Sequence, residues 1–145
     1  MDKYMEIALK EALVAYEENE IPVGAVIVFD DKVLCKTHNE KEKYKNSLKH
    51  AELLAINIAS EIKKDWRLND CDLYVTMEPC LMCIGALIQC RIRNVYYLID
   101  NPKFGGLNNL DLNKYNHKIN IYKLENNKLN NYYKKLLQKF FKDKR

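Results

Sequence analysis

Apolar residues recur along the chain at two spacings, and each spacing predicts a different element. Residues 4–18 carry apolar side chains three and four positions apart, the pattern of an amphipathic helix. Residues 23–29 are a β-branched run, and residues 32–37 continue it after two aspartates. Because two extended runs around a short polar turn form a hairpin, residues 23–37 are expected to make two antiparallel strands.

The rest of the chain alternates between helical and extended patterns. Helices are predicted at residues 48–62, 81–90 and 129–141, strands at residues 73–76, 95–99 and 119–124, and a loop at residues 101–109. A hairpin followed by alternating helices and strands predicts an α/β fold, a three-layer α/β/α sandwich whose mixed sheet has about five strands and helices on both faces. No repeat or linker interrupts the pattern, so residues 1–145 are expected to form a single domain.

Composition narrows the possible partners and the location. A chain of 145 residues can bury a core without disulfides. We find no apolar stretch long enough for a secretory signal near the start, or for a membrane span anywhere, so a cytoplasmic location is expected. The net charge of +4 is uneven, because residues 101–145 contain 11 Lys and Arg but 3 Asp and Glu. This basic segment favours a polyanionic partner.

Two short segments carry the residues best suited to metal chemistry. They are residues 50–52 (His-Ala-Glu) and 79–83 (Pro-Cys-Leu-Met-Cys), and each lies at the start of a predicted helix. A Cys-x-x-Cys pair in a first helical turn directs both sulfurs to one point, where the positive helix end favours thiolates. His50, Cys80 and Cys83 together provide the nitrogen and sulfur donors that zinc prefers, with the fourth position left for water.

Glu52 distinguishes a catalytic zinc from a structural one. Zinc lowers the pKa of a bound water from 15.7 towards about 7, and a carboxylate two residues past His50 is placed to exchange a proton with that water. Alone, the Cys-x-x-Cys could be a redox pair or half of a four-ligand structural zinc site, and the His-x-Glu an ordinary helix start. The two segments together favour a catalytic metal.

The other cysteines and histidines are poor candidates for a fourth ligand. Cys90 lies seven residues beyond Cys83, so it is about 10 Å further along the same helix. Cys35 and Cys71 are expected to be buried thiols that act as small apolar side chains. His38 and His117 are not at ligand spacing, and a surface position is favoured for both over contact with a substrate.

The two segments resemble the signature of the cytidine and nucleobase deaminase superfamily. Within it the chain is similar over nearly its whole length to the bacterial-type tRNA-specific adenosine deaminases, which convert the wobble adenosine of an arginine tRNA to inosine. The matching residues are Ile21-Pro22-Val23-Gly24-Ala25-Val26, Asn39, Thr76-Met77-Glu78-Pro79-Cys80-Leu81-Met82-Cys83, Arg91-Ile92 and Phe140-Phe141. The resemblance implies a hydrolase with one zinc ion per subunit.

The resemblance also implies roles for individual residues. His50, Cys80 and Cys83 would bind the zinc, and Glu52 would carry protons from the activated water to the purine. The residues expected to contact the substrate are Val23, Asn39, Ala51, Pro79, Phe141, Lys142 and Lys144, with Asn39 hydrogen-bonded to the target base. The partner would be a tRNA anticodon stem-loop, with the ACG anticodon of tRNA-Arg, whose unpaired bases can be splayed out. The family also implies a homodimer with the helix of residues 81–90 near the interface.

The predicted C-terminal helix has two open interpretations. Its aromatic residues are Tyr132, Tyr133, Phe140 and Phe141, and lysines are interleaved with them. These rings could stack on RNA bases while the lysines contact phosphates. Alternatively, the rings pack on the protein core and the lysines are solvated.

Two other functions would retain the same metal ligands. A deaminase of a free nucleobase or nucleotide, of the guanine, cytosine or dCMP type, would need Glu52 as well. The basic C-terminal third and the segments around Val23 and Asn39 argue against it. A non-catalytic RNA-binding subunit with a structural zinc would have no use for Glu52 beside an open coordination position.

Overall fold

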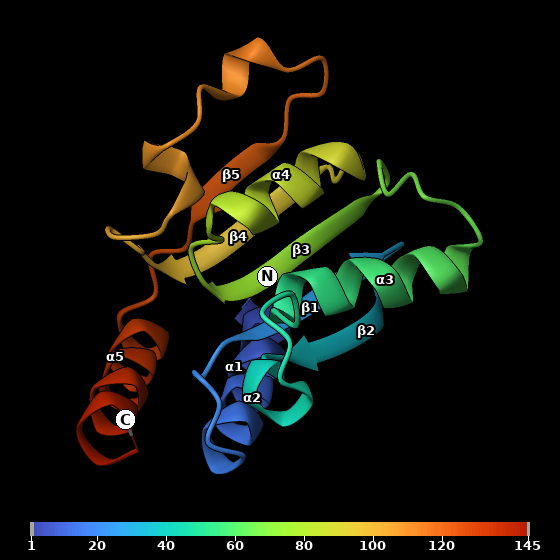
Figure 1. Cartoon of the computed structure of the whole chain (residues 1–145). Helices are drawn as coiled ribbons and strands as arrows, with labels where there is room; N and C mark the ends of the chain where they lie inside the picture. The colour runs from blue at the N-terminus through green and yellow to red at the C-terminus, as the bar shows by residue number, and fades with distance from the viewer. Residues whose placement is uncertain (1, 145) are drawn as a thin grey trace.

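The computed structural model describes residues 2–144, and in it five strands form one sheet between two layers of helices (Figure 1). This confirms the predicted α/β/α sandwich with a mixed sheet. The elements are α1 (Asp2–Glu17), β1 (Gly24–Phe29), β2 (Lys32–His38), α2 (Lys41–Tyr44), α3 (Ala51–Lys63), β3 (Cys71–Met77), α4 (Leu81–Gln89), β4 (Asn94–Ile99), the 3-10 turns η1 (Gly106–Asn108) and η2 (Leu112–Lys114), β5 (Asn120–Lys123) and α5 (Asn127–Asp143). None of the helices described is both long and apolar enough to cross a bilayer.

The sheet has the strand order β2-β1-β3-β4-β5. β1 is antiparallel to β2 and β3, whereas β3, β4 and β5 are parallel. Asp30 and Asp31 make the predicted two-residue turn with φ values of 52° and 60°, which is the positive-φ backbone that tight hairpins require. Because β3 and β4 are parallel, their carboxyl ends lie at the same end of the sheet. Binding sites of open α/β sheets lie at this end.

Helices cover the two faces of the sheet in pairs (Figure 1). α3 and α4 pack on one face, where Ala55 and Leu87 are fully buried, and α1 and α5 pack on the other. α1 lies very close to β1, since a Cβ atom at Gly24 would lie 1.9 Å from the carbonyl oxygen of Ala8. Glycine at position 24 therefore permits this close packing.

The structure corrects the predicted start of α3 and adds a helix. Leu48 is an exposed residue of the preceding loop, and the extended backbone of His50 (φ −81°, ψ 148°) lies directly before the first helical residue, Ala51. The apolar spacing extended the predicted helix too far because Leu48 mimicked its apolar face. α2 was not predicted, because its four residues have no apolar period. It is held instead by the carboxylate of Glu20, which accepts hydrogen bonds from its backbone.

Some aromatic side chains of α5 pack on the protein core, and others are exposed and so remain available to stack on RNA bases. Tyr133 is fully buried and its hydroxyl donates to the carbonyl oxygen of Pro22 at 2.7 Å. Phe140 is also buried, with its ring against that of Tyr16. Tyr132 and Phe141 are 47% and 44% exposed. Stacking on RNA is therefore wrong for Tyr133, whose ring and hydroxyl hold α5 to the core.

Candidate active site

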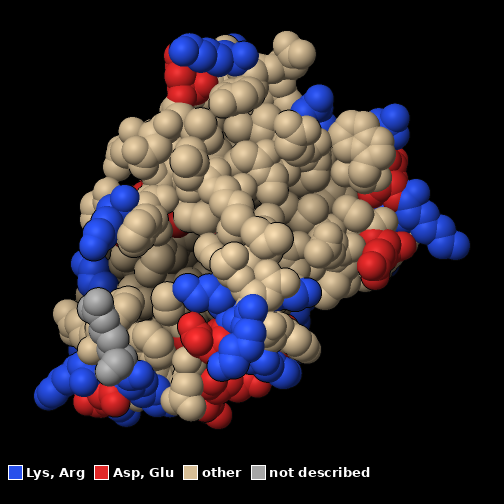
Figure 2. Space-filling model, viewed as in Figure 1, with Lys and Arg blue, Asp and Glu red and all other residues tan. Residues whose placement is uncertain are grey.

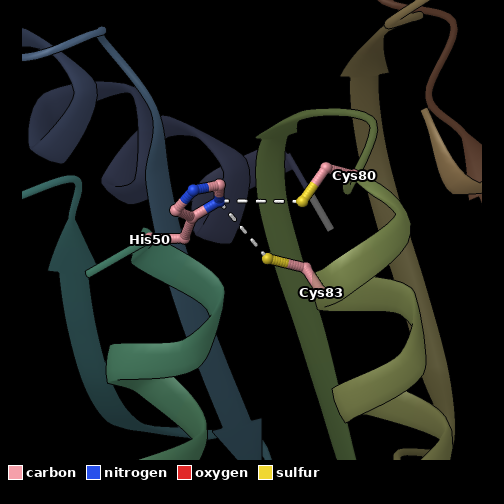
Figure 3. Close-up of side chains that lie close together, drawn as sticks. All are labelled: His50, Cys80 and Cys83. Atoms are coloured by element: carbon pink, nitrogen blue, oxygen red, sulfur yellow. Dashed lines mark hydrogen bonds between the residues drawn. The ribbon is translucent and has the colours of Figure 1, made fainter. Parts of the chain in front are cut away.

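The starts of α3 and α4 lie close together near the carboxyl ends of the parallel strands (Figure 3). His50 is the last residue before α3, and Cys80 is the last residue before α4. Cys83 lies in the first turn of α4, directly after the connection from β3. Because the two helices lie on the same face of the sheet, side chains 30 and 33 residues apart in the sequence point to one place.

The three side chains have the geometry of metal ligands. The Nδ1 atom of His50 lies 3.7 Å from Sγ of Cys80 and 3.6 Å from Sγ of Cys83 (Figure 3). Zinc bound by nitrogen at about 2.0 Å and sulfur at about 2.3 Å with tetrahedral angles places these atoms about 3.6 Å apart. All three donor atoms lie within 4.8 Å of one another. The donor set and its spacing therefore fit a zinc ion.

Hydrogen bonds among the three groups shift their pKa values. A hydrogen bond with Cys83 is the main cause that lowers the pKa of Cys80, and a bond with Cys80 is the main cause that raises the pKa of Cys83. The pKa of His50 is raised, chiefly by its hydrogen bond with Cys80. A metal ion bound where the three donor atoms converge would displace protons from these groups, since its ligands bind in deprotonated form.

Glu52 lies beside the three donors, in the first turn of α3. Its side chain is buried, with an exposed fraction of 4%, and it interacts with the thiol of Cys83. Burial raises the pKa of the Glu52 carboxyl to about 7. The carboxyl group lines the same cavity as His50 and Cys80, so a carboxyl group, an imidazole and a thiol converge on one cavity.

The cavity in front of these groups has a volume of about 1090 Å³. Four residues predicted to contact the substrate line it: Val23, Asn39, Phe141 and Lys144. The other three, Ala51, Pro79 and Lys142, are not part of its lining. Figure 2 shows the cavity as a hollow, with Lys and Arg side chains interspersed with Asp and Glu below it, over α2 and α5. Contact of these residues with a substrate stays a prediction.

Four of the residues predicted to contact the substrate have hydrogen-bond partners inside the protein. The backbone N–H of Ala51 donates to Oδ1 of Asn39 at 2.8 Å, so Asn39 connects the end of β2 to the start of α3. The carbonyl oxygen of Pro79 accepts the N–H of Gly106 at 2.9 Å. Lys144 also has an internal contact, because its Nζ donates to the carbonyl oxygen of Tyr16.

Sequence reasoning gave no role to two buried carboxylates of the cavity wall. Glu20 is 2% exposed and accepts hydrogen bonds from the backbone of α2. Glu78 is 4% exposed and accepts hydrogen bonds from the segment after β4. For Glu78 the available signal was its place between a buried strand and Pro79. Glu20 has no comparable signal in the sequence.

The other cysteines and histidines of the described residues are not part of the group formed by His50, Cys80 and Cys83. Cys35 and Cys71 are buried, as predicted, and Cys90 is buried as well. Burial raises the pKa values of Cys35, Cys71 and Cys90 to about 11, 12 and 11. His38 and His117 are partly buried, so the surface position favoured for them holds only in part. Each histidine ring contacts other residues of the chain.

The chain is similar in sequence to known proteins. The profile of the MafB19-like deaminase family matches residues 1–145. The chain belongs to this deaminase family. A tRNA-specific adenosine deaminase of Rickettsia felis is 41% identical to this deaminase over 123 residues, which are 83% of this chain and 85% of the relative. The enzyme of the same name from Streptococcus pyogenes serotype M1 is 45% identical over 107 residues, 74% of this chain. The matched part spans 63% of the length of the streptococcal protein.

A solved structure is similar to this deaminase over almost its full length. The structure comes from a study of A-to-I editing by tRNA:A34 deaminases at the wobble position of transfer RNA. Its TM-score is 0.85 at 33% identity, and the match covers 94% of this chain and 100% of that chain. Together with the family profile, these likenesses confirm the predicted family and the deaminase fold.

Proposed function

We propose that this deaminase hydrolyses adenosine to inosine at the wobble position of a tRNA anticodon, with one zinc ion per subunit. The observation that carries the proposal is the convergence of His50, Cys80 and Cys83 on one point, beside the buried carboxyl group of Glu52. A structural zinc site needs a fourth protein ligand, and among the described residues the group of candidate ligands contains three. The fourth position is therefore assigned to water.

The chemistry divides between the metal and Glu52. When bound by His50, Cys80 and Cys83, zinc would lower the pKa of water and so supply a nucleophile near neutral pH. Glu52 takes a proton from that water and delivers it to N1 of the adenine ring as C6 is attacked. Glu52 then takes the proton of the hydroxyl group now on C6 and transfers it to the amino group, so that C6=O forms, the C6–N bond breaks and ammonia leaves. The balance is adenosine and water to inosine and ammonia, and Glu52 ends in its starting state.

Asn39 and Val23 are proposed to orient the base. Because Oδ1 of Asn39 accepts the N–H of Ala51, the side-chain nitrogen of Asn39 is the atom left to donate a hydrogen bond in the cavity. Val23 is buried and lines the same wall, where it offers an apolar surface to a purine ring. This pairing of one fixed polar group with apolar contact is the common composition of a small-molecule site.

Several observations support RNA as the substrate rather than a free base. The cavity volume of about 1090 Å³ is at the upper end of the range of about 300–1,000 Å³ that is usual for small ligands. Lys41, Lys103 and Lys144 line it, and the half-exposed ring of Phe141 lies at the same rim. Lysines and aromatic rings suit phosphates and unpaired bases. The names of the relatives support tRNA, and the ACG anticodon of tRNA-Arg is the proposed target.

The proposed enzyme is a homodimer that acts in the cytoplasm. Leu81 and Met82, on the first turn of α4, are 48% and 36% exposed, and apolar side chains at this position support the predicted interface on α4. Sedimentation at micromolar concentration measures the mass and so tests the dimer. The cytoplasmic location stays a prediction.

One assay tests the function and its main alternative on the same sample. The protein is incubated with an ACG anticodon stem-loop, with a control stem-loop that has guanosine at the wobble position, and with free adenine, guanine, cytosine and their nucleosides. Zinc is measured per subunit in parallel. We expect inosine in the ACG stem-loop alone and one zinc per subunit. Turnover of a free base without inosine in the stem-loop would contradict the proposal and establish the free-base alternative.

A further inference from the structure

Glu78 occupies an unusual place beside the proposed metal site. It lies between the end of β3 and Pro79, and its side chain is 4% exposed. Its Oε1 accepts the backbone N–H of Asn101 at 3.0 Å, and its Oε2 accepts that of Leu107 at 3.3 Å. One buried carboxylate thus holds both ends of residues 101–107, across 23 and 29 positions of sequence.

The segment of residues 101–107 is folded closely around this carboxylate. The N–H of Gly105 donates to the carbonyl oxygen of Asn101 at 2.7 Å, and the N–H of Phe104 donates to Oδ1 of Asn101 at 3.2 Å. A Cβ atom at Gly105 would lie 2.0 Å from Oε2 of Glu78 and 2.4 Å from the carbonyl oxygen of Asn101. Position 105 therefore has room for glycine alone while the carboxylate stays in place.

The same segment is also bonded to the loop that carries the metal ligands. The N–H of Leu81 donates to the carbonyl oxygen of Phe104 at 3.2 Å, and the N–H of Gly106 donates to that of Pro79 at 2.9 Å. Residues 80 and 105 pair as an isolated β-bridge. The position of residues 101–107 is therefore fixed relative to Cys80, the point where the target base would react.

On its outer side the segment forms part of the cavity wall. Pro102, Lys103 and Phe104 line the cavity, and Phe104 is 64% exposed. The Nζ atom of Lys103 lies 5.6 Å from the centre of the Phe104 ring. An exposed ring with an adjacent ammonium group matches an unpaired nucleotide, whose base stacks on the ring while its phosphate faces the cation. Neither side chain has an evident structural role, since both are at the surface.

We infer that Glu78 is a positioning residue for the RNA substrate: it holds residues 101–107 so that Phe104 and Lys103 receive a nucleotide next to the target base. The inference rests on the proposed function. Glu78 does not touch the reacting atoms in this scheme. It acts by keeping one wall ordered before the RNA binds, which removes the entropy cost of ordering that wall on binding.

Two variants disturb the contact from opposite sides. Glu78→Gln keeps one acceptor oxygen and turns an NH₂ group towards a backbone N–H, whereas Gly105→Ala leaves the carboxylate and pushes it away. The matched control is Asp72→Asn at the other end of β3, where a carboxylate accepts hydrogen bonds from Arg93 and Asn94. Having a variant on each side of the contact keeps the test valid if one of them does not fold.

The first readout is amide hydrogen exchange of the zinc-loaded protein. We expect the amides of Asn101 and Leu107 to exchange faster in Glu78→Gln and Gly105→Ala, and at the wild-type rate in Asp72→Asn. Unchanged exchange at both amides would overturn the inference whether or not the protein edits RNA. A wild-type protein that forms no inosine would contradict the proposed function and, with it, the role of Glu78 towards RNA, while the exchange result still reports on the contact.

The second readout is a double-mutant cycle on the ACG stem-loop. Glu78→Gln and Phe104→Ala are each expected to raise KM on the order of tenfold, with kcat within about twofold and zinc content unchanged. If Glu78 acts through the segment, Phe104→Ala has little further effect in the Glu78→Gln background. Full additivity of the two effects would overturn the inference. A lower kcat together with lost zinc would also overturn it, because Glu78 would then support the metal loop instead.

Discussion

Asn39 has a structural contact with the start of α3 and a proposed contact with the base in the cavity. Two substitutions separate these two roles. Its Oδ1 accepts the N–H of Ala51 at 2.8 Å, and its side chain is 8% exposed in the cavity wall. Asn39→Asp keeps an acceptor for Ala51 but removes the side-chain donor. Asn39→Ala removes both. The first variant should therefore affect catalysis alone, and the second should affect catalysis and stability.

The expected magnitudes follow from the contacts. Asn39→Ala leaves a buried backbone N–H without its partner, at a cost of about 1–3 kcal/mol. A loss near the middle of that range lowers Tm by about 4–8 °C for a chain of this size. In Asn39→Asp the new carboxylate lies at the positive end of α3, so Tm should stay within about 2 °C of wild type. The lost hydrogen bond to the base should lower kcat/KM on the order of tenfold in both variants.

Two measurements on each variant check this reasoning. Thermal unfolding of the zinc-loaded proteins gives Tm, and inosine formation in the ACG stem-loop gives kcat/KM. Full kcat/KM in Asn39→Asp would refute the assignment of the side-chain nitrogen as a donor to the base. A wild-type Tm in Asn39→Ala would refute the structural role of the bond to Ala51.

Three further predictions concern the metal site and the charge of a histidine. Glu52→Gln should lower kcat by about 10²–10⁴, the usual contribution of general acid–base catalysis, with zinc content unchanged. Cys83→Ala should lose zinc in elemental analysis and should unfold at a lower temperature than zinc-loaded wild type, because a bound metal stabilises the folded state. His38→Gln should lower the free energy of unfolding below about pH 6.5. This difference from wild type should disappear as the pH rises through the raised pKa of folded His38, because wild type loses the stabilisation there. Urea unfolding at pH 5.5 and 8.5 measures this difference.

The sign of the His38 effect follows from its surroundings. Burial lowers the pKa of its imidazole, but hydrogen bonds with Glu11 and Glu18 outweigh burial and leave the pKa raised. The folded state thus binds the proton more tightly than the unfolded chain does. A stability difference that grew between pH 5.5 and 8.5 would contradict this argument. Unchanged kcat in Glu52→Gln would show that Glu52 is not the proton carrier. Zinc retained by Cys83→Ala would show that the thiol of Cys83 is not a zinc ligand.

The sequence by itself determined most elements of the sandwich and the candidate residues of the proposed metal site. Apolar spacing is a local property, so strands such as β1 and β4 could be predicted from a few consecutive residues. The ligand types were visible in the same way, because Cys80 and Cys83 lie within one turn and Glu52 lies two residues after His50. Local patterns were weaker at boundaries, where the exposed Leu48 extended the predicted α3.

Only the tertiary structure decided which groups meet across long stretches of chain. The convergence of His50 with Cys80 depends on two helices packing side by side on one face of the sheet. α2 and the segment of residues 101–107 have no apolar period, and the buried carboxylates of Glu20 and Glu78 hold them through backbone N–H groups more than 20 positions away. A buried carboxylate must find such partners, but its sequence neighbours do not reveal which backbone will supply them.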